Sequence, residues 1–131
     1  MKKIFLALAA FAAMTAVSCV KDEQNPDALV PEPEPEVVYD GYYDIDKSAE
    51  VTARILDKLF ATMADFGVNL KACILKCNMV LAGKQFGEST PDEVGEATAK
   101  VLKEHVPSEL AGVVFLSGGQ TVEQATNNPK V

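Results

Sequence analysis

The 131-residue sequence is poor in the residue types that build metal sites and nucleic-acid interfaces. Its single histidine is His105, and histidine and cysteine form no cluster with metal-ligand spacing, so we expect no protein metal site. Lys and Arg number 12 against 19 Asp and Glu, and no basic patch is interleaved with aromatic residues. The resulting net charge of −7 argues against nucleic acid as a partner.

The N-terminus is apolar, but its apolar run lacks the length of a comfortable membrane span. The run covers residues 4–17 and follows Lys2 and Lys3. The sequence AVSC at 16–19 then resembles the cleavage box of a bacterial lipoprotein, in which the cysteine becomes lipidated. We therefore predict a lipoprotein-type signal peptide over 1–19 with lipidation at Cys19, a flexible linker over 20–28 and a membrane-anchored localisation. The alternative is an uncleaved anchor helix.

The remaining residues, 29–131, alternate strands and helices, which predicts a parallel α/β domain. We expect one helix from the cap Asp46 to Gly67, and a second from the cap Thr90 to His105. The core stripe of the first helix is predicted to be Val51, Ile55, Leu59, Met63 and Phe66. Strands are expected at 68–76 and 112–116, the latter buried on both faces, and a short helix at 121–126.

Lys76 stands at the end of a short apolar run, just before a polar turn. In a strand, Ala72, Ile74 and Lys76 share one face, while Cys73 and Leu75 share the other. A buried lysine amine is costly to keep charged, so its pKa falls and it becomes a nucleophile that forms Schiff bases with carbonyl compounds. The alternative is a strand-end lysine whose amine reaches water.

Two motifs in this part of the chain resemble class I fructose-1,6-bisphosphate aldolase. The run LKCNMV at 75–80 is similar to the family's Leu-Lys-Pro-Asn-Met-Val, and LSGGQ at 116–120 matches the family's phosphate-holding turn. The resemblance covers 29–131. It implies a partial (β/α)8 barrel of roughly units five to seven, with three strands and three helices, and a family that is cytoplasmic.

The resemblance also implies roles for five residues. Lys76 would form a Schiff base with the ketone of a sugar phosphate, and Glu34, 42 positions earlier, would handle protons there. The substrate phosphate would lie on Ser117, Gly118 and Gly119, since two glycines let backbone N–H groups form a nest. No metal or organic cofactor is implied.

Residues 25–36 allow two interpretations. The sequence PEPEPE at 31–36 has the composition of an acidic polyproline II spacer. Prolines at alternate positions also remove hydrogen-bond donors along one side of a strand. The run VPEPEPE at 30–36 is, however, similar to the end of the family's fifth barrel strand, and this alignment places Glu34 in the site.

The sequence departs from the family in ways that limit the expected function. Cys77 replaces the proline after the Schiff-base lysine, and the first four barrel units and the eighth have no counterpart. Three strands cannot close a barrel, so we expect open sheet edges available for self-association. We therefore expect a truncated lyase that is inactive alone. The alternative is a membrane-tethered lipoprotein that acts as an interaction or structural module, or a fusion artefact, without catalysis.

Overall fold

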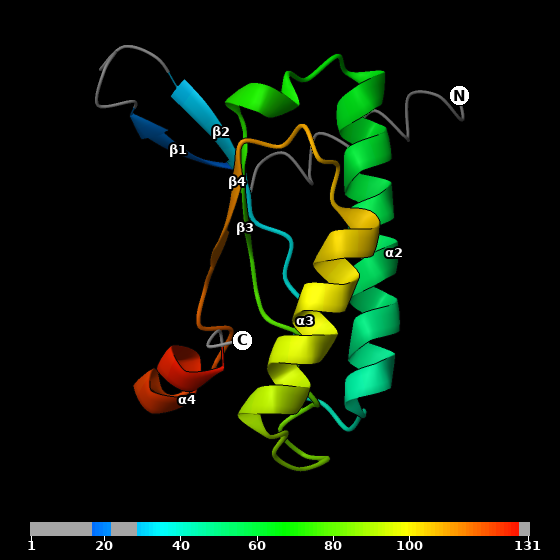
Figure 1. Ribbon diagram of the computed structural model, residues 1–131, viewed down its shortest axis with the longest axis vertical. Helices are drawn as coiled ribbons and strands as arrows, with labels where there is room; N and C mark the ends of the chain where they lie inside the picture. The colour runs from blue at the N-terminus through cyan, green and yellow to red at the C-terminus, as the bar shows by residue number, and fades with distance from the viewer. Residues whose placement is uncertain (1–16, 22–28, 129–131) are drawn as a thin grey trace.

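The computed structural model describes residues 17–21 and 29–128, which form two layers (Figure 1). Two long helices, α2 and α3, lie side by side and cover one face of a short parallel sheet. The elements are β1 (Val17–Lys21), β2 (Leu29–Pro33), α2 (Ile45–Asp65), the 3-10 turn η1 (Leu70–Ala72), β3 (Ile74–Cys77), α3 (Pro91–His105), β4 (Gly112–Phe115) and α4 (Val122–Asn127).

The strands form two separate two-stranded sheets. β3 and β4 are parallel, with Ile74 opposite Gly112 and Cys77 opposite Phe115, and α3 is the connection between them. β2 pairs antiparallel with β1 and lies against β3, yet no ladder joins β2 to β3 in the described part of the chain. The expected single three-stranded sheet is therefore wrong. Prolines at alternate positions of this segment deprive one edge of β2 of N–H donors.

The N-terminal segment is described only in part. Residues 29–33 form a strand, so the polyproline spacer is not what the structure has at Pro31 and Pro33. Val20 and Lys21, expected in the linker, belong to β1. Residues 1–16 and 22–28, and with them most of the expected signal peptide and linker, lie outside the described residues. In the described ranges no helix is long and apolar enough to cross a membrane.

Helix α2 begins two residues earlier than expected and ends where expected. Its cap is Asp44, whose carboxylate accepts a hydrogen bond from the Lys47 N–H at 2.7 Å, so the expected cap Asp46 lies in the first turn instead. Gly67 follows the helix with a φ of 66°, and its N–H donates to the Ala64 carbonyl. The Gly67 prediction is confirmed, because this left-handed position ends a helix at low cost only with glycine.

The buried stripe of α2 differs from the expected one. Its buried residues are Ser48, Thr52, Leu56, Phe60 and Met63, so only Met63 was predicted. Phe66, expected in the core, is 53% exposed. α2 packs against both β3 and α3, and small polar residues occupy part of its line of contact. A pattern of large apolar residues does not reveal that line.

Helix α3 follows its sequence signals closely. Thr90 is the cap and His105 the last residue, as predicted; Thr90 and Glu93 form a reciprocal capping box, and Pro91 is the first helical residue. His105 Nδ1 lies 2.7 Å from the Asp57 carboxylate of α2, so the pair links the two helices at the surface.

In the parallel sheet, β3 is shorter than expected and β4 is less buried than expected. β3 starts at Ile74 because residues 70–72 form η1, with the Asn69 side chain accepting from the Lys71 N–H. β4 lies close to its predicted position but is not buried on both faces, since Val114 and Phe115 are 42% and 39% exposed. The reason is that β4 lies at the edge of the sheet, and that Val114, which pairs with Lys76, is on the face that the helices leave uncovered.

The main core lies between β3 and the two helices. Its buried members come from α2, the residue before β3, β3 itself, the segment after β3, and α3; they are Leu56, Phe60, Met63, Cys73, Leu75, Cys77, Val80 and Val101. The opposite face of β3, which carries Ile74 and Lys76, is half-buried. The core thus fixes β3 from one side and leaves the other side for the candidate site.

Candidate active site at the carboxyl ends of the strands

The predicted site residues lie at the ends of strands or just after them, and these strand ends meet at one edge of the fold. β3 and β4 are parallel, and the Leu116 N–H donates to the Cys77 carbonyl at 3.0 Å, which continues their contact past the last ladder pair. Lys76 and Ser117 therefore belong to the same end of the sheet. Glu34 follows β2, which lies against β3.

Lys76 and Glu34 are in direct contact. Lys76 Nζ lies 3.2 Å from Glu34 Oε1, and the two side chains are 33% and 26% exposed. Lys76 shares its face with Ile74 while Leu75 and Cys77 enter the core, as the strand alternation predicts. The amine is half-buried rather than enclosed, because no helix of the described residues covers this face. A carboxylate at this distance from an amine can exchange protons with it.

The glycine turn has the conformation that a nest of N–H donors requires. Gly118 and Gly119 have φ values of 57° and 84°, a left-handed region that strains other residues. The Ser117 carbonyl accepts from the backbone N–H of Gln120 at 3.0 Å and from its side chain at 2.9 Å. α4 has only six residues, so the glycine backbone itself is the main source of donors.

Two side chains support this turn. A Cβ added to Gly118 would lie 3.0 Å from the Cβ of Asn78, and one added to Gly119 would lie 3.0 Å from the ring of Tyr39. Tyr39 comes from the loop after β2 and Asn78 from the end of β3. The glycines therefore pack closely on both, and a larger residue would displace the turn.

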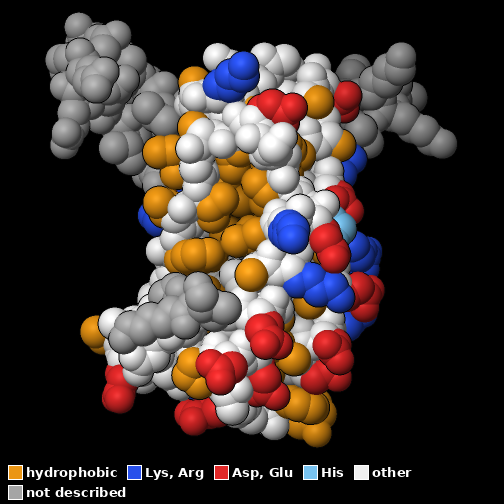
Figure 2. Space-filling view, viewed as in Figure 1, with side chains coloured by type: hydrophobic (Ala, Val, Ile, Leu, Met, Phe, Trp, Pro, Cys, Tyr) orange, Lys and Arg blue, Asp and Glu red, His pale blue; other side chains and the backbone are white. Residues whose placement is uncertain are grey.

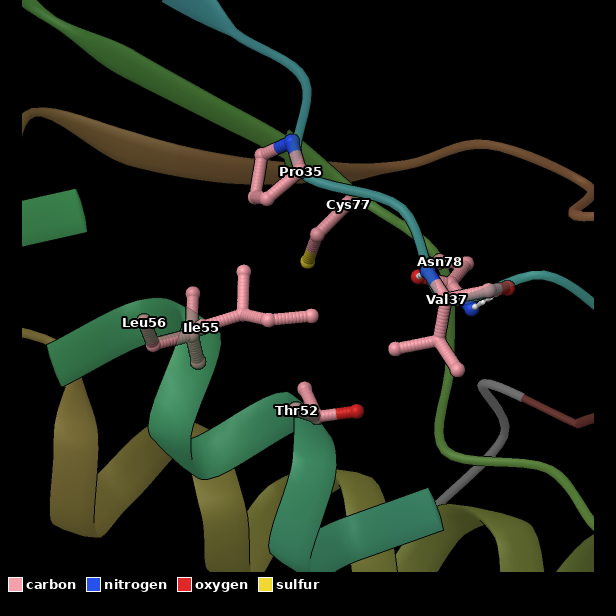
Figure 3. A pocket seen from close by; sticks show the side chains of 7 residues that line it. All are labelled: Pro35, Val37, Thr52, Ile55, Leu56, Cys77 and Asn78. Carbon is pink, nitrogen blue, oxygen red and sulfur yellow. Dashed lines mark hydrogen bonds between the residues drawn. The ribbon is translucent and has the colours of Figure 1, made fainter. Parts of the chain in front are cut away.

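Asn78 is a site residue to which the sequence analysis gave no role. Its side chain is 7% exposed, accepts a hydrogen bond from the Val37 N–H at 3.2 Å and donates to the Val37 carbonyl at 3.3 Å (Figure 3). The available signal was a polar residue inside an apolar run. Buried polar groups are rarely left without partners, so such a residue predicts a specific contact.

Cys77, in place of the family's proline, points away from Lys76. Its side chain is 2% exposed, and burial raises the pKa of the thiol to about 11. The thiol is therefore neutral near pH 7 and a poor nucleophile. Its sulfur points into an apolar cavity of about 10 Å³ lined by Pro35, Val37, Thr52, Ile55, Leu56, Cys77 and Asn78 (Figure 3).

Two further titratable groups, His105 and Lys84, have other surroundings. His105 is engaged with Asp57 on the helix layer, and Lys84 is exposed on a loop. Within the described ranges, no three His, Cys, Asp or Glu side chains are grouped so that they could hold a metal ion.

Comparisons with known proteins agree with these motifs. A probable class 1 fructose-bisphosphate aldolase of Xanthomonas axonopodis pv. citri is 48% identical over 75% of this chain and 30% of the relative. The cytoplasmic isozyme of spinach (Spinacia oleracea) is 42% identical over 78% of this chain and 29% of its own length. The solved fructose-bisphosphate aldolase of Plasmodium falciparum, in complex with TRAP and a small-molecule inhibitor, superposes with a TM-score of 0.75 at 42% identity.

That superposition covers 79% of this chain and 30% of the Plasmodium protein. The chain thus spans less than a third of the length of these relatives. The model of the family described as glycolytic class I fructose-bisphosphate aldolase matches residues 7–130, a range that includes part of the expected signal peptide. With nearly its whole length matched, this chain belongs to the class I fructose-bisphosphate aldolase family.

Proposed function

We propose that Lys76 forms an imine with the ketone of a triose or hexose phosphate. The amine nitrogen adds to the carbonyl carbon, and the carbonyl oxygen leaves as water once it has gained protons. Glu34 supplies and recovers these protons because its carboxylate lies 3.2 Å from the amine. The resulting iminium is the electron sink for carbon–carbon cleavage, and the products in the relatives' reaction would be dihydroxyacetone phosphate and glyceraldehyde 3-phosphate.

One observation carries this proposal: the contact between Glu34 and Lys76, which are 42 positions apart in the sequence. It lies at the edge of the sheet where Ser117, Gly118 and Gly119 turn. A phosphate held by the turn would present the substrate carbonyl to the amine, which replaces a random encounter with an oriented one.

For these 131 residues alone we propose imine formation without steady-state cleavage. Lys76 is a third exposed, and the face that carries it has no opposing layer in the described residues. A site open to water weakens the electrostatic interactions on which the later steps depend. Turnover of fructose 1,6-bisphosphate by the chain alone is expected to be undetectable.

The test is reductive trapping. The full chain is incubated with dihydroxyacetone phosphate and borohydride, and intact mass is recorded. We expect one permanent adduct, lost in Lys76→Arg because arginine stays charged and forms no imine. Ser117→Ala should weaken trapping of the phosphate compound while leaving the chemistry possible. An unchanged adduct in Lys76→Arg would refute the proposal.

A second candidate function is a membrane-tethered module that associates through its sheet. The observation that favours it is the exposure of Val114 and Phe115 on an edge strand. Figure 2 shows hydrophobic side chains gathered over the sheet next to α3, whereas charged side chains gather over the helices. Lipidation at Cys19 would supply the membrane anchor. Intact-mass measurement of the chain produced in a bacterial host tests this lipidation. A full-length, unlipidated protein would contradict it.

A further inference from the structure

We infer that Asn78 is a positioning residue that couples the imine pair Glu34–Lys76 to the glycine turn. The inference rests on the proposed function of Lys76, and it concerns how the two halves of that site are held in register. No step of the chemistry passes through Asn78 itself.

The first half of the argument is the missing ladder between β2 and β3. β2 lies against β3 without backbone pairing among the described residues. The Asn78 carboxamide supplies one donor and one acceptor to the backbone of Val37, at 3.3 and 3.2 Å, as a ladder partner would. Val37 lies three residues after Glu34. These two bonds therefore fix the segment that carries the carboxylate relative to the strand that carries Lys76.

The second half is the contact of Asn78 with the turn. Gly118 is buried, and its missing Cβ would lie 3.0 Å from the Cβ of Asn78. Asn78 also lies two residues after Lys76. The Asn78 side chain, at the end of β3, therefore contacts both the segment after β2 and the turn after β4.

The chemistry of the carboxamide makes the inference testable. Aspartate has nearly the same shape but is acceptor-only when ionised, so Asn78→Asp would set a carboxylate oxygen against the Val37 carbonyl. The matched control is Thr98→Val. The Thr98 hydroxyl accepts from the Val80 N–H at 2.9 Å in the core, so this variant also loses a buried hydrogen bond two residues along the same segment, but against α3.

The experiment measures trapping rates of the full chain with two carbonyl probes, dihydroxyacetone and dihydroxyacetone phosphate, per folded molecule. We expect Asn78→Asp to slow trapping of both probes at least about tenfold, since small misplacements of reacting groups are costly. For this variant, the ratio of the trapping rate with dihydroxyacetone phosphate to that with dihydroxyacetone should also fall towards one. Thr98→Val should stay within about twofold of the parent for both probes. A folded Asn78→Asp protein with the parent's rates and preference would overturn the inference.

A second measurement separates this inference from the proposed function. Backbone amide NMR of Asn78→Asp should move the signals of Val37 and Gly118 together, whereas Thr98→Val should move neither. If the parent traps no probe but the amide signals respond in this way, the imine proposal fails and the coupling stands. Where Asn78→Asp does not fold, Asn78→Ser takes its place in both measurements. Independent responses of Val37 and Gly118 would overturn the coupling.

Discussion

The two faces of β3 differ in which parts of the chain cover them. Leu75 and Cys77 are 0% and 2% exposed because α2 and α3, which precede and follow β3 in the sequence, cover them. Ile74 and Lys76, on the other face, are half-buried; Lys76 contacts Glu34 after β2 and pairs with Val114 of the neighbouring strand. The comparison teaches that stability and chemistry are separable here: the helix-facing side holds the fold together, while the open side carries the groups that would react.

The largest effect expected from this difference is on stability. Leu75→Ala should lower the free energy of unfolding by about 2–5 kcal/mol, because it opens a cavity in the core. Ile74→Ala, one residue away on the open face, should cost less than half as much. Urea unfolding of both variants measures the contrast. Equal losses would mean that the open face is packed as tightly as the helix-facing one.

A smaller effect should follow from pH through Cys77. Its folded pKa of about 11 lies above the ordinary value of 9.0. Below pH 9 the thiol is neutral in both states. Between these pH values the unfolded thiol loses its proton first, so the folded state becomes less stable as pH rises, by up to about 3 kcal/mol.

Cys77→Val is the control for this alkaline loss, since it keeps an apolar side chain and removes the titration. The measured quantity is the difference in unfolding free energy between parent and variant at pH 8 and at pH 11. A difference that does not change with pH would show that the Cys77 thiol reaches water.

A gain in stability is expected at Thr52, on the helix side of the same cavity. Its hydroxyl is buried and, in the described part of the chain, is the one buried side-chain polar atom without a hydrogen-bond partner. Thr52→Val keeps the shape and removes the unpaired group, which should stabilise the fold by about 1 kcal/mol. Thermal unfolding measures the change. A destabilised variant would indicate that the hydroxyl has a partner, such as bound water.

The smallest effect on stability is expected on the open face of β4. Val114→Lys should change the unfolding free energy by no more than about 0.5 kcal/mol, because Val114 is 42% exposed. It should nevertheless reduce self-association, since charge on an edge strand opposes pairing. Sedimentation velocity over a range of concentrations compares the two proteins. Identical association would exclude this edge as the contact.

The features that the sequence predicts well are those decided by near neighbours in the chain. The cap at Thr90 and the helix end at Gly67 depend on a few adjacent residues, and both are as expected. The shared edge of Lys76 and the glycine turn follows from alternating strands and helices, because such strands run parallel. The proximity of Lys76 to the glycine turn was therefore predictable from the sequence alone.

The features that escaped prediction depend on partners distant in sequence. Ser48 and Thr52 are buried because two elements meet along α2, which apolar periodicity does not report. The bonds of Asn78 to Val37 replace a ladder that prolines prevent, and no local pattern indicates that exchange. The exposure of Val114 and Phe115 likewise reflects missing cover rather than any property of the strand.

The most direct test of the account is to locate the trapped adduct within the chain. After borohydride reduction with dihydroxyacetone phosphate, peptide mass spectrometry compares modification at every lysine. The account predicts that Lys76, although half-buried, carries most of the adduct and exceeds the exposed Lys84, because Lys76 is paired with Glu34. Modification distributed over the lysines according to their exposure, with Lys76 no more reactive than Lys84, would contradict it.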